Sequence, residues 1–233
     1  ENNIESIDAA GARMVHRDHT IYMFGGPTNS FYAFTYNEMI YKNVNFLAGS
    51  WSFVSQLDIV PEARIDHAMT IYESFIYLYG GYMTDADNKE IEDTRLWSYD
   101  ISTNVWNTLN VTGNPLHLYN HSMIIHQNML YISNNQSLFS ITLSDPYTWS
   151  IIQQTTIQPS QQTCLYSNGL SLYLFTTYED YLIDSNNNDI TPIQRKHSFN
   201  LTSVIYNEYT LYAIDDSNTW YPFTLSEYAD IPI

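Results

Sequence analysis

Short apolar runs separated by polar pairs and by glycines recur along the whole chain. The clearest group lies within residues 61–106, where the runs MTIY and FIYLY are separated by Glu73-Ser74 and followed by Gly80-Gly81. After an acidic stretch come the run LWSYD, the turn sequence ISTN and then Val105-Trp106. Runs of this length that are rich in Ile, Tyr and Trp and bounded by turn residues indicate β-strands. Four strands in about 45 residues have the length of one β-propeller blade.

The first two of these strands form a hairpin pattern that occurs five times without a gap. AGARMVHRDHTIYMFGG, NHSMIIHQNMLYISN, QTCLYSNGLSLYLFTT and NLTSVIYNEYTLYAIDD align with IDHAMTIYESFIYLYGG when the tyrosine three residues before the double glycine serves as the anchor. The anchors are 55, 54, 42 and 39 residues apart, so the repeats shorten along the chain. Every copy has tyrosine there: Tyr22, Tyr77, Tyr131, Tyr173 and Tyr212. Self-similarity of this kind predicts a repeat architecture.

The second repeat closely resembles a kelch repeat. Arg64 and His67 precede its hairpin, Gly80-Gly81 follows it, and Tyr99 and Trp106 come at the separation expected in that family. The resemblance covers nearly the whole chain and is strongest in the first two repeats. It implies a propeller, and by analogy with other kelch proteins an adaptor or scaffold.

The later repeats depart from the double-glycine pattern. Gly25-Gly26 matches Gly80-Gly81, but Ser133-Asn134, Thr176-Thr177 and Asp215-Asp216 stand at the equivalent places in the other repeats. Glycine is expected there because the end of the second strand needs a positive φ or a close backbone approach. Asn and Asp tolerate that conformation better than Thr, so the fourth repeat fits least well. The histidine that opens the hairpin is kept as His121 in the third repeat.

These patterns predict an all-β fold, a kelch-type β-propeller of about five blades of antiparallel strands. We expect a single domain over residues 1–233, with blades at roughly 10–57, 58–109, 110–152, 153–193 and 194–233. Residues 1–9 are the candidate for a strand that closes the ring and removes its open edge. Kelch propellers usually have six or seven blades, so the alternatives are a longer protein or a ring shared with another chain. Closure is favoured because an unclosed arc of repeats would leave apolar faces uncovered.

Composition and charge exclude several classes of partner. Hydrophobic residues make up 44% of the chain and aromatic residues 15%, which is too much for a disordered protein. Eight Lys and Arg against 25 Asp and Glu give a net charge of −17, so nucleic acid and anionic membrane surfaces are not expected as partners. Since no run of eighteen apolar residues occurs, we expect no membrane insertion by this chain.

The compartment is indicated only indirectly. The single Cys164 excludes an internal disulfide framework, and the start at Glu1 without a leading apolar segment fits a processed protein or an excised fragment equally. Low lysine content and four glycosylation sequons favour an extracellular or cell-surface glycoprotein, with glycans as further possible partners and the cytoplasm as the alternative. The candidate glycosylation sites are Asn110, Asn120, Asn135 and Asn200.

Three patterns bear on catalysis, and none supports it. In the group His117, His121 and His126, the last two are an odd number of positions apart and so do not share one face of a strand. His121 also takes the place of the structural histidine of a kelch repeat, so packing is favoured over a metal site. Galactose oxidase has a kelch-like propeller, but Cys164 lies in an apolar strand, where an inert thiol is expected. Residues 213–220 partly resemble the Asp box of sialidases, which is a structural turn. We therefore expect no enzyme, no cofactor and no metal.

What remains is a binding face formed by long loops after the double glycines. In the second repeat this loop carries Asp85, Asp87, Glu90, Glu92 and Asp93. These acids either bind a basic segment of another protein or only keep the loop hydrated and soluble. Weak calcium binding is only a minor alternative, since this loop lacks the glycine that a calcium-binding loop has. In the enlarged first repeat, Tyr36 and Tyr41 are candidates for an aromatic contact surface.

The sequence thus predicts a non-catalytic protein-interaction or scaffold module. It would be a subunit or ectodomain of a larger assembly, with other protein chains as its partners. The alternative is a secreted carbohydrate-active or oxidase-type propeller enzyme.

Overall fold

All the secondary structure in the described part of the chain is β-strand. The computed structural model describes residues 9–41, 44–54, 59–113, 115–134, 137–153, 163–176, 179–193, 201–207, 210–215 and 220–224. The chain divides into two compact units, residues 1–120 and 121–233. The prediction of an all-β fold is confirmed.

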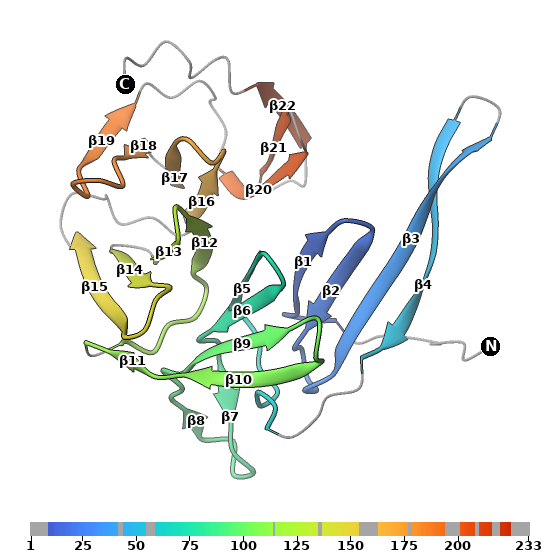
Figure 1. The fold of residues 1–233 in the computed structure, drawn as a ribbon, viewed down its shortest axis with the longest axis horizontal. Coiled ribbons are helices and arrows are strands. Elements are labelled where there is room, and N and C mark those ends of the chain that lie inside the picture. The colour runs from blue at the N-terminus through green and yellow to red at the C-terminus, as the bar shows by residue number, and fades with distance from the viewer. Residues whose placement is uncertain are drawn as a thin grey trace. The chain divides into compact units, whose positions relative to one another are not determined.

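The first unit contains two four-stranded antiparallel sheets (Figure 1). One has the order β1-β2-β3-β4 and the other β5-β6-β9-β10, so the strands of each sheet follow one another along the chain. A two-stranded hairpin, β7-β8, is inserted between β6 and β9. The bounds are β1 Arg13–Arg17, β2 Thr20–Phe24, β3 Phe31–Tyr41, β4 Val44–Phe53, β5 Ala68–Tyr72, β6 Phe75–Tyr79, β7 Met83–Thr84, β8 Glu90–Ile91, β9 Leu96–Asp100, β10 Val105–Leu109 and β11 Val111–Thr112.

The enlarged segment of the first repeat is a long hairpin and not a loop. β3 and β4 pair from Tyr32 opposite Phe53 to Tyr41 opposite Val44. β2 pairs only with residues 31–35 of β3, so the outer half of this hairpin extends past the rest of its sheet, as Figure 1 shows. Both strands contain several Phe, Tyr, Trp and Ile residues, which favour strands, and this is consistent with strand pairing in place of the expected loop.

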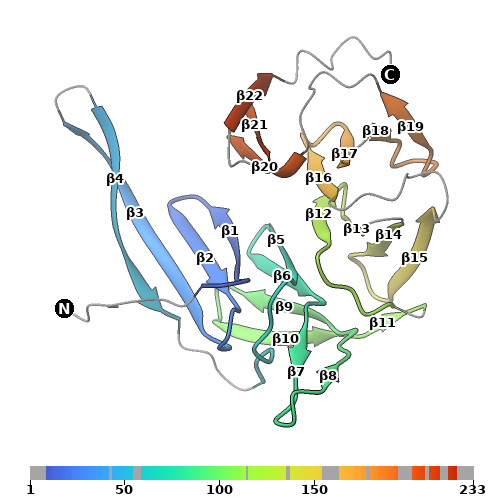
Figure 2. The same ribbon diagram turned by 180° about the vertical axis from the view of Figure 1, so that it is seen from behind.

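The second unit is also built of antiparallel sheets whose strands follow one another along the chain (Figure 2). Its sheets have the orders β12-β13-β14-β15, β16-β17-β18-β19 and β20-β21-β22, all antiparallel. The bounds are β12 Ser122–His126, β13 Met129–Ser133, β14 Leu138–Thr142, β15 Tyr147–Gln153, β16 Thr163–Ser167, β17 Leu172–Thr176, β18 Asp180–Ile183, β19 Ile190–Ile193, β20 Leu201–Asn207, β21 Thr210–Asp215 and β22 Trp220–Thr224.

The five anchor tyrosines occupy one register in five hairpins. Each is paired with the residue seven positions before it, from Val15 opposite Tyr22 to Ile205 opposite Tyr212. Tyr77, Tyr131 and Tyr173 are buried. Tyr22 is partly buried, and the side chain of Tyr212 lies outside the described residues. A shared register places equivalent side chains on the same face of each sheet, because strand side chains alternate with a period of two.

Backbone hydrogen bonds join successive repeats of the first unit at equivalent positions. The N–H of Asp66 donates to the carbonyl of Gly11, and the N–H of Asn120 donates to the carbonyl of Asp66. All three residues have positive φ values, 72°, 56° and 51°. Gly, Asp and Asn are the residues that adopt this conformation most readily.

A second pair of equivalent bonds starts from the double glycines. The N–H of Gly26 donates to the carbonyl of Arg64, and that of Gly81 donates to the carbonyl of Leu118. Arg64 and Leu118 occupy the same position in successive repeats. The same two main-chain contacts thus connect repeat one to two and repeat two to three.

The double glycines are also sites of close packing. Gly25 has a φ of 90°, and a Cβ there would lie 2.5 Å from Cε1 of His67. A Cβ on Gly81 would lie 2.8 Å from Cβ of the same histidine. His67 is fully buried between the two glycine pairs, which gives a physical reason for both features of the repeat.

Each unit has its own hydrophobic core. In the first, Phe31 of one sheet packs edge-on against Tyr99 of the other at 4.7 Å between ring centroids, and Phe24 lies 5.4 Å from Trp106. In the second, Tyr131, Leu138, Leu165, Leu172, Leu174, Tyr181 and Ile183 form the buried cluster. Adjacent sheets therefore bury one another's apolar faces, as stacked repeats must.

Candidate functional site

The hairpin β7-β8 projects after the double glycine of the second repeat. Met83 pairs with Ile91 and Thr84 with Glu90. One oxygen of Asp85, Oδ1, accepts hydrogen bonds from the N–H groups of Asp87 and Lys89, both at 2.9 Å. Asp85 therefore shapes the turn, in the manner of an Asx turn.

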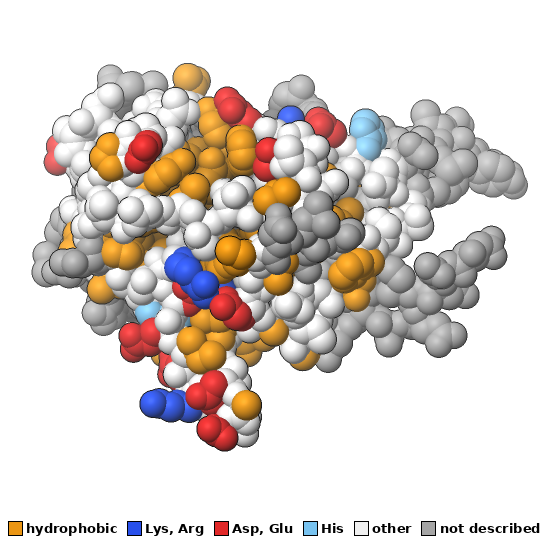
Figure 3. Space-filling model, turned by 60° about the horizontal axis from the view of Figure 1, so that its bottom comes forward, with side chains coloured by type: hydrophobic (Ala, Val, Ile, Leu, Met, Phe, Trp, Pro, Cys, Tyr) orange, Lys and Arg blue, Asp and Glu red, His pale blue; other side chains and the backbone are white. Residues whose placement is uncertain are grey.

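Around that turn the side chains are exposed and mostly acidic. Asp85, Asp87, Glu90 and Glu92 are all exposed, and Lys89 is the basic residue among them. Figure 3 shows red acidic and blue basic side chains close together on this side of the first unit, with orange hydrophobic side chains between them. The hairpin thus offers negative charge to solvent.

A buried ion pair anchors the base of the hairpin. Nη2 of Arg64 lies 2.9 Å from Oδ2 of Asp93, and the side chains of both are almost fully buried. Arg64 also donates from Nη1 to the carbonyl of Gly80 at 2.9 Å and from Nε to the carbonyl of Glu62 at 3.0 Å. A buried ion pair needs such additional hydrogen bonds to offset the loss of hydration.

Arg95 extends this pair into a network of four charges. Its Nε donates to Oδ1 of Asp93 at 2.7 Å, and its Nη2 donates to both carboxylate oxygens of Glu62 at 2.9 and 2.8 Å. The guanidinium also lies 4.8 Å from the ring centroid of Trp97, within the range of a cation–π contact. Two arginines and two carboxylates are therefore held in fixed positions.

The pKa values follow from this arrangement. Burial alone would raise the pKa of Asp93, but hydrogen bonds from Arg95 and the charge of Arg64 lower it to about 2. Burial lowers the pKa of Arg64 although Asp93 opposes this change. The carboxylates raise the pKa of Arg95, the hydrogen bond from its side chain to Asp93 being the main cause. All these groups are charged at neutral pH.

His117 connects the network to the following segment. Its Nδ1 lies 3.1 Å from the backbone N of Asp93, and its Nε2 lies 3.6 Å from Oε1 of Glu90. Nearby, the hydroxyl of Tyr79 donates to the carbonyl of Leu116. Burial raises the pKa of Tyr79, so this phenol stays protonated.

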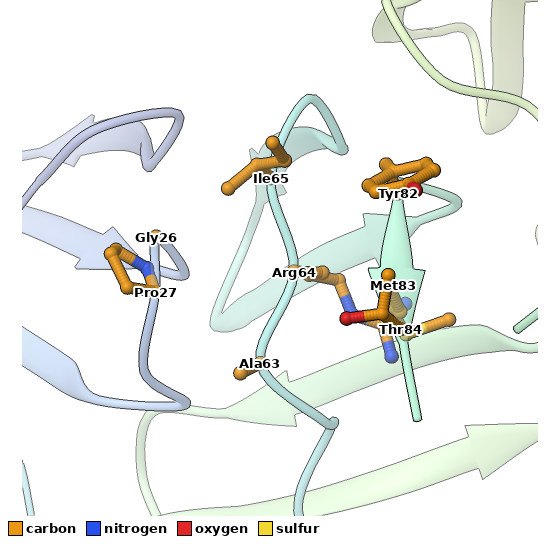
Figure 4. A pocket seen from close by; sticks show the side chains of 8 residues that line it. All are labelled: Gly26, Pro27, Ala63, Arg64, Ile65, Tyr82, Met83 and Thr84. Carbon is orange, nitrogen blue, oxygen red and sulfur yellow. The ribbon is translucent and has the colours of Figure 1, made fainter. Parts of the chain in front are cut away.

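A cavity of about 270 Å³ lies beside the network (Figure 4). One wall is the loop after β2, and another is the segment before β5 that includes Arg64. The start of the β7-β8 hairpin forms the third wall. The cavity is lined by Gly26, Pro27, Ala63, Arg64, Ile65, Tyr82, Met83 and Thr84.

Comparison with known proteins decides the family. The model of the KLHDC2/KLHL20/DRC7 Kelch-repeats domain matches residues 11–211. This chain belongs to the Kelch-repeat family. Domains of this family commonly bind other proteins and are generally non-catalytic. The prediction of a kelch-type β-propeller is confirmed, whereas the number of blades stays a prediction. The predicted closing strand at residues 1–9 lies outside the described residues except for Ala9.

One relative and one solved structure are also similar to this chain. Human Kelch domain-containing protein 1 is 36% identical over 53 residues, a match that spans 22% of this chain and 13% of that protein. The solved structure of YjhT has a similar fold, with a TM-score of 0.67 at 12% identity, covering 89% of this chain and 72% of that chain. No helix in the described part of the kelch chain is long and apolar enough to cross a bilayer.

Tyr36 and the acidic residues that were predicted to bind are not brought together. Tyr36 follows the stretch of β3 that pairs with β2, so it lies near the β1-β2 turn, where its hydroxyl is 2.6 Å from Nε2 of His16. The acidic hairpin follows the double glycine, at the other end of the kelch hairpins. Asp93 differs from its acidic neighbours because it is buried in the ion network. The side chain of Tyr41 lies outside the described residues.

The other candidates have ordinary surroundings. Among the described residues, no group of three His, Cys, Asp or Glu is placed to hold a metal ion. His126 contacts the hydroxyl of Ser167 at 2.8 Å. Asn110 and Asn120 are exposed, whereas Asn135 and Asn200 lie outside the described residues.

Sequence reasoning missed Glu62, Arg95 and His117 as members of the network. The sequence did contain a signal for Arg95. Asp93, Arg95 and Trp97 are each two positions apart, and residues two apart on an extended chain face the same side. Glu62 and His117 come from segments distant in sequence, and no local pattern connects them to Asp93.

Proposed function

We propose that this kelch domain is a non-catalytic module that binds a basic segment of another protein at the β7-β8 hairpin. It would serve as a subunit or ectodomain of a larger assembly. The observation that carries the proposal is the display of exposed carboxylates on a short hairpin whose base is fixed by an ionic network around the buried pair Arg64–Asp93. Family membership supports protein binding in general.

The charges favour a basic partner for electrostatic reasons. Asp87, Glu90 and Glu92 are exposed and are accompanied by Lys89, and the whole chain carries a net charge of −17. Complementary charge speeds the encounter with a cationic segment and disfavours acidic ones. The rigid base reduces the ordering cost of binding, because the hairpin's ends are already held.

A peptide titration tests this proposal. The probe is a fluorescent 12-residue peptide of Lys, Gly and Ser, compared with the same peptide in which every Lys is Glu. We expect the full chain to bind the Lys peptide and not the Glu peptide in an anisotropy titration. The Asp87→Asn/Glu92→Gln variant should weaken binding by about fivefold or more.

The matched control removes two charges elsewhere in the chain. Glu73→Gln/Asp145→Asn changes exposed acids that lie away from the hairpin in sequence. Equal affinities for the two variants would reject the hairpin as the binding surface, as would equal binding of the Lys and Glu peptides.

A further inference from the structure

The cavity beside the hairpin lacks free polar groups on several of its walls. The N–H of Gly26 is bonded to the carbonyl of Arg64, and Ile65 and Tyr82 exchange their backbone hydrogen bonds at 3.1 and 2.7 Å. Pro27 has no N–H. A group that binds in this cavity therefore meets few backbone N–H donors that still need a hydrogen-bond acceptor.

Arg64 does not present a free charge to the cavity either. Its guanidinium is bonded to Gly80, Glu62 and Asp93, so its donors are directed into the ion network. A carboxylate guest would have to compete with Asp93, which is held by two arginines. The cavity is therefore better suited to an uncharged group than to an anion.

The size of the cavity indicates what kind of group fits. Sites for drug-sized ligands usually occupy about 300–1,000 Å³, and this cavity has about 270 Å³. Carbon atoms of Pro27, Ile65 and Met83 line it, as Figure 4 shows. One aliphatic or aromatic side chain is a better match than a complete small molecule.

Exposed apolar side chains occur around the same segments. Tyr82 and Ile91 on the hairpin are more than one third exposed, and so are Leu116 and Tyr119 on the segment that bonds to Tyr79 and Gly81. Single exposed apolar residues are normal, but several on adjoining segments are typical of protein contact surfaces.

We infer that the cavity receives one apolar side chain of the basic segment, with the flanking Lys or Arg residues on the carboxylates of the β7-β8 hairpin. The inference rests on the proposed function and specifies its partner as a basic segment with a single apolar anchor. The cavity supplies an apolar contact, and the hairpin supplies the charge complementarity.

The test compares three Lys-rich 12-residue peptides that differ only at the central position, which is Leu, Phe or Gly. We expect the full chain to bind the Leu or the Phe peptide at least tenfold more tightly than the Gly peptide. Thr84→Phe, which places a ring at the exposed edge of the cavity, should remove this preference. Thr108→Phe, at an exposed position of β10, should keep the preference.

A second measurement uses the chain without any substitution, so its result does not depend on whether a variant folds. Met83 lines the cavity and is buried, so its methyl resonance should shift when the Leu peptide is added and stay in place with the Gly peptide. Equal affinities for the Leu, Phe and Gly peptides, or an unmoved Met83 methyl, would overturn the cavity inference and leave the proposed function standing. Failure of all the Lys-rich peptides to bind would overturn both.

Discussion

At the scale of single residues, the main finding is that one acidic residue of the second repeat is structural. Asp93 accepts hydrogen bonds from Arg64, Arg95 and the indole of Trp97. Breaking a buried ion pair by removing one partner is costly because the other charge stays buried without compensation. Asp93 should therefore matter more for stability than Asp87, which is exposed.

A pH prediction follows from the pKa of Asp93. Its folded pKa of about 2 lies below the ordinary value of 3.8, so the ionised carboxylate stabilises the fold above about pH 4 by an amount on the order of 2 kcal/mol. This contribution is lost as the pH falls towards 2. We expect Asp93→Asn to reduce the free energy of unfolding at pH 7, and the gap between variant and wild type to narrow between pH 4 and 2.

Urea unfolding at several pH values measures that gap. Asp87→Asn is the control, because it removes an acid of the same loop without touching the network. A gap that stays constant from pH 7 to pH 2 would contradict the assigned role of Asp93.

The sequence could not separate Asp93 from the neighbouring acids. All of them lie in one polar stretch, and burial depends on Arg64, which is 29 residues away in the chain. In contrast, the anchor tyrosines were found from sequence because the hairpin is a local structure with fixed spacing. The cavity was not predicted, since its walls come from two different repeats.

At the scale of elements, the repeated unit is the hairpin with its anchor tyrosine. Tyr77 is buried in the centre of β6, opposite Thr70 and Ser98. Tyr72, in the neighbouring strand β5, is exposed. The two tyrosines thus offer a matched comparison within a single hairpin.

We expect Tyr77→Ala to lower the free energy of unfolding by about 3 to 5 kcal/mol, because a large buried side chain is replaced by a cavity. Tyr72→Ala should cost less than about 1 kcal/mol, as usual for exposed positions. Chemical denaturation of both variants measures the difference. Similar losses would show that Tyr77 is not a core residue of its blade.

The double glycine gives a second prediction at this scale. Gly25 and Gly169 both have positive φ values, but an added Cβ meets His67 and the carbonyl of Arg64 at Gly25 and nothing within 4 Å at Gly169. Gly169→Ala should therefore cost about 1 kcal/mol for backbone strain alone. Gly25→Ala should cost about 2 kcal/mol more, because overpacking is added.

Thermal unfolding of the two glycine variants is sufficient to compare them. Equal losses would mean that backbone conformation, and not contact with His67, explains the glycine at the end of β2.

The enlarged first repeat shows where the prediction of secondary-structure elements failed. The sequence indicated a loop there, whereas β3 and β4 pair along ten positions. This pairing depends on contact between two separate segments, which the local sequence pattern does not show.

At the scale of the whole molecule, charge has opposite effects on stability and on binding. With a net charge of −17, repulsion among exposed acids opposes the compact state, whereas the same charges attract a basic segment. Salt screens both effects, with a Debye length of about 10 Å at 0.1 M and about 3 Å at 1 M.

Raising NaCl from 0.05 to 0.5 M should therefore increase the unfolding temperature and weaken binding of the Lys peptide by about tenfold or more. Differential scanning fluorimetry and the anisotropy titration measure the two quantities. An unfolding temperature that falls with salt would show that attractive surface pairs outweigh the repulsion. Binding that does not change with salt would argue against an electrostatic contact.

The contacts that join Gly11, Asp66 and Asn120 use only main-chain atoms. Side chains elsewhere in a blade can therefore diverge while these junctions are preserved, provided that the junction residue tolerates the left-handed conformation. This freedom accounts for the variation among the first three copies. It also makes entire blades natural modules for building chimaeras, with the cut sites placed immediately before these three residues.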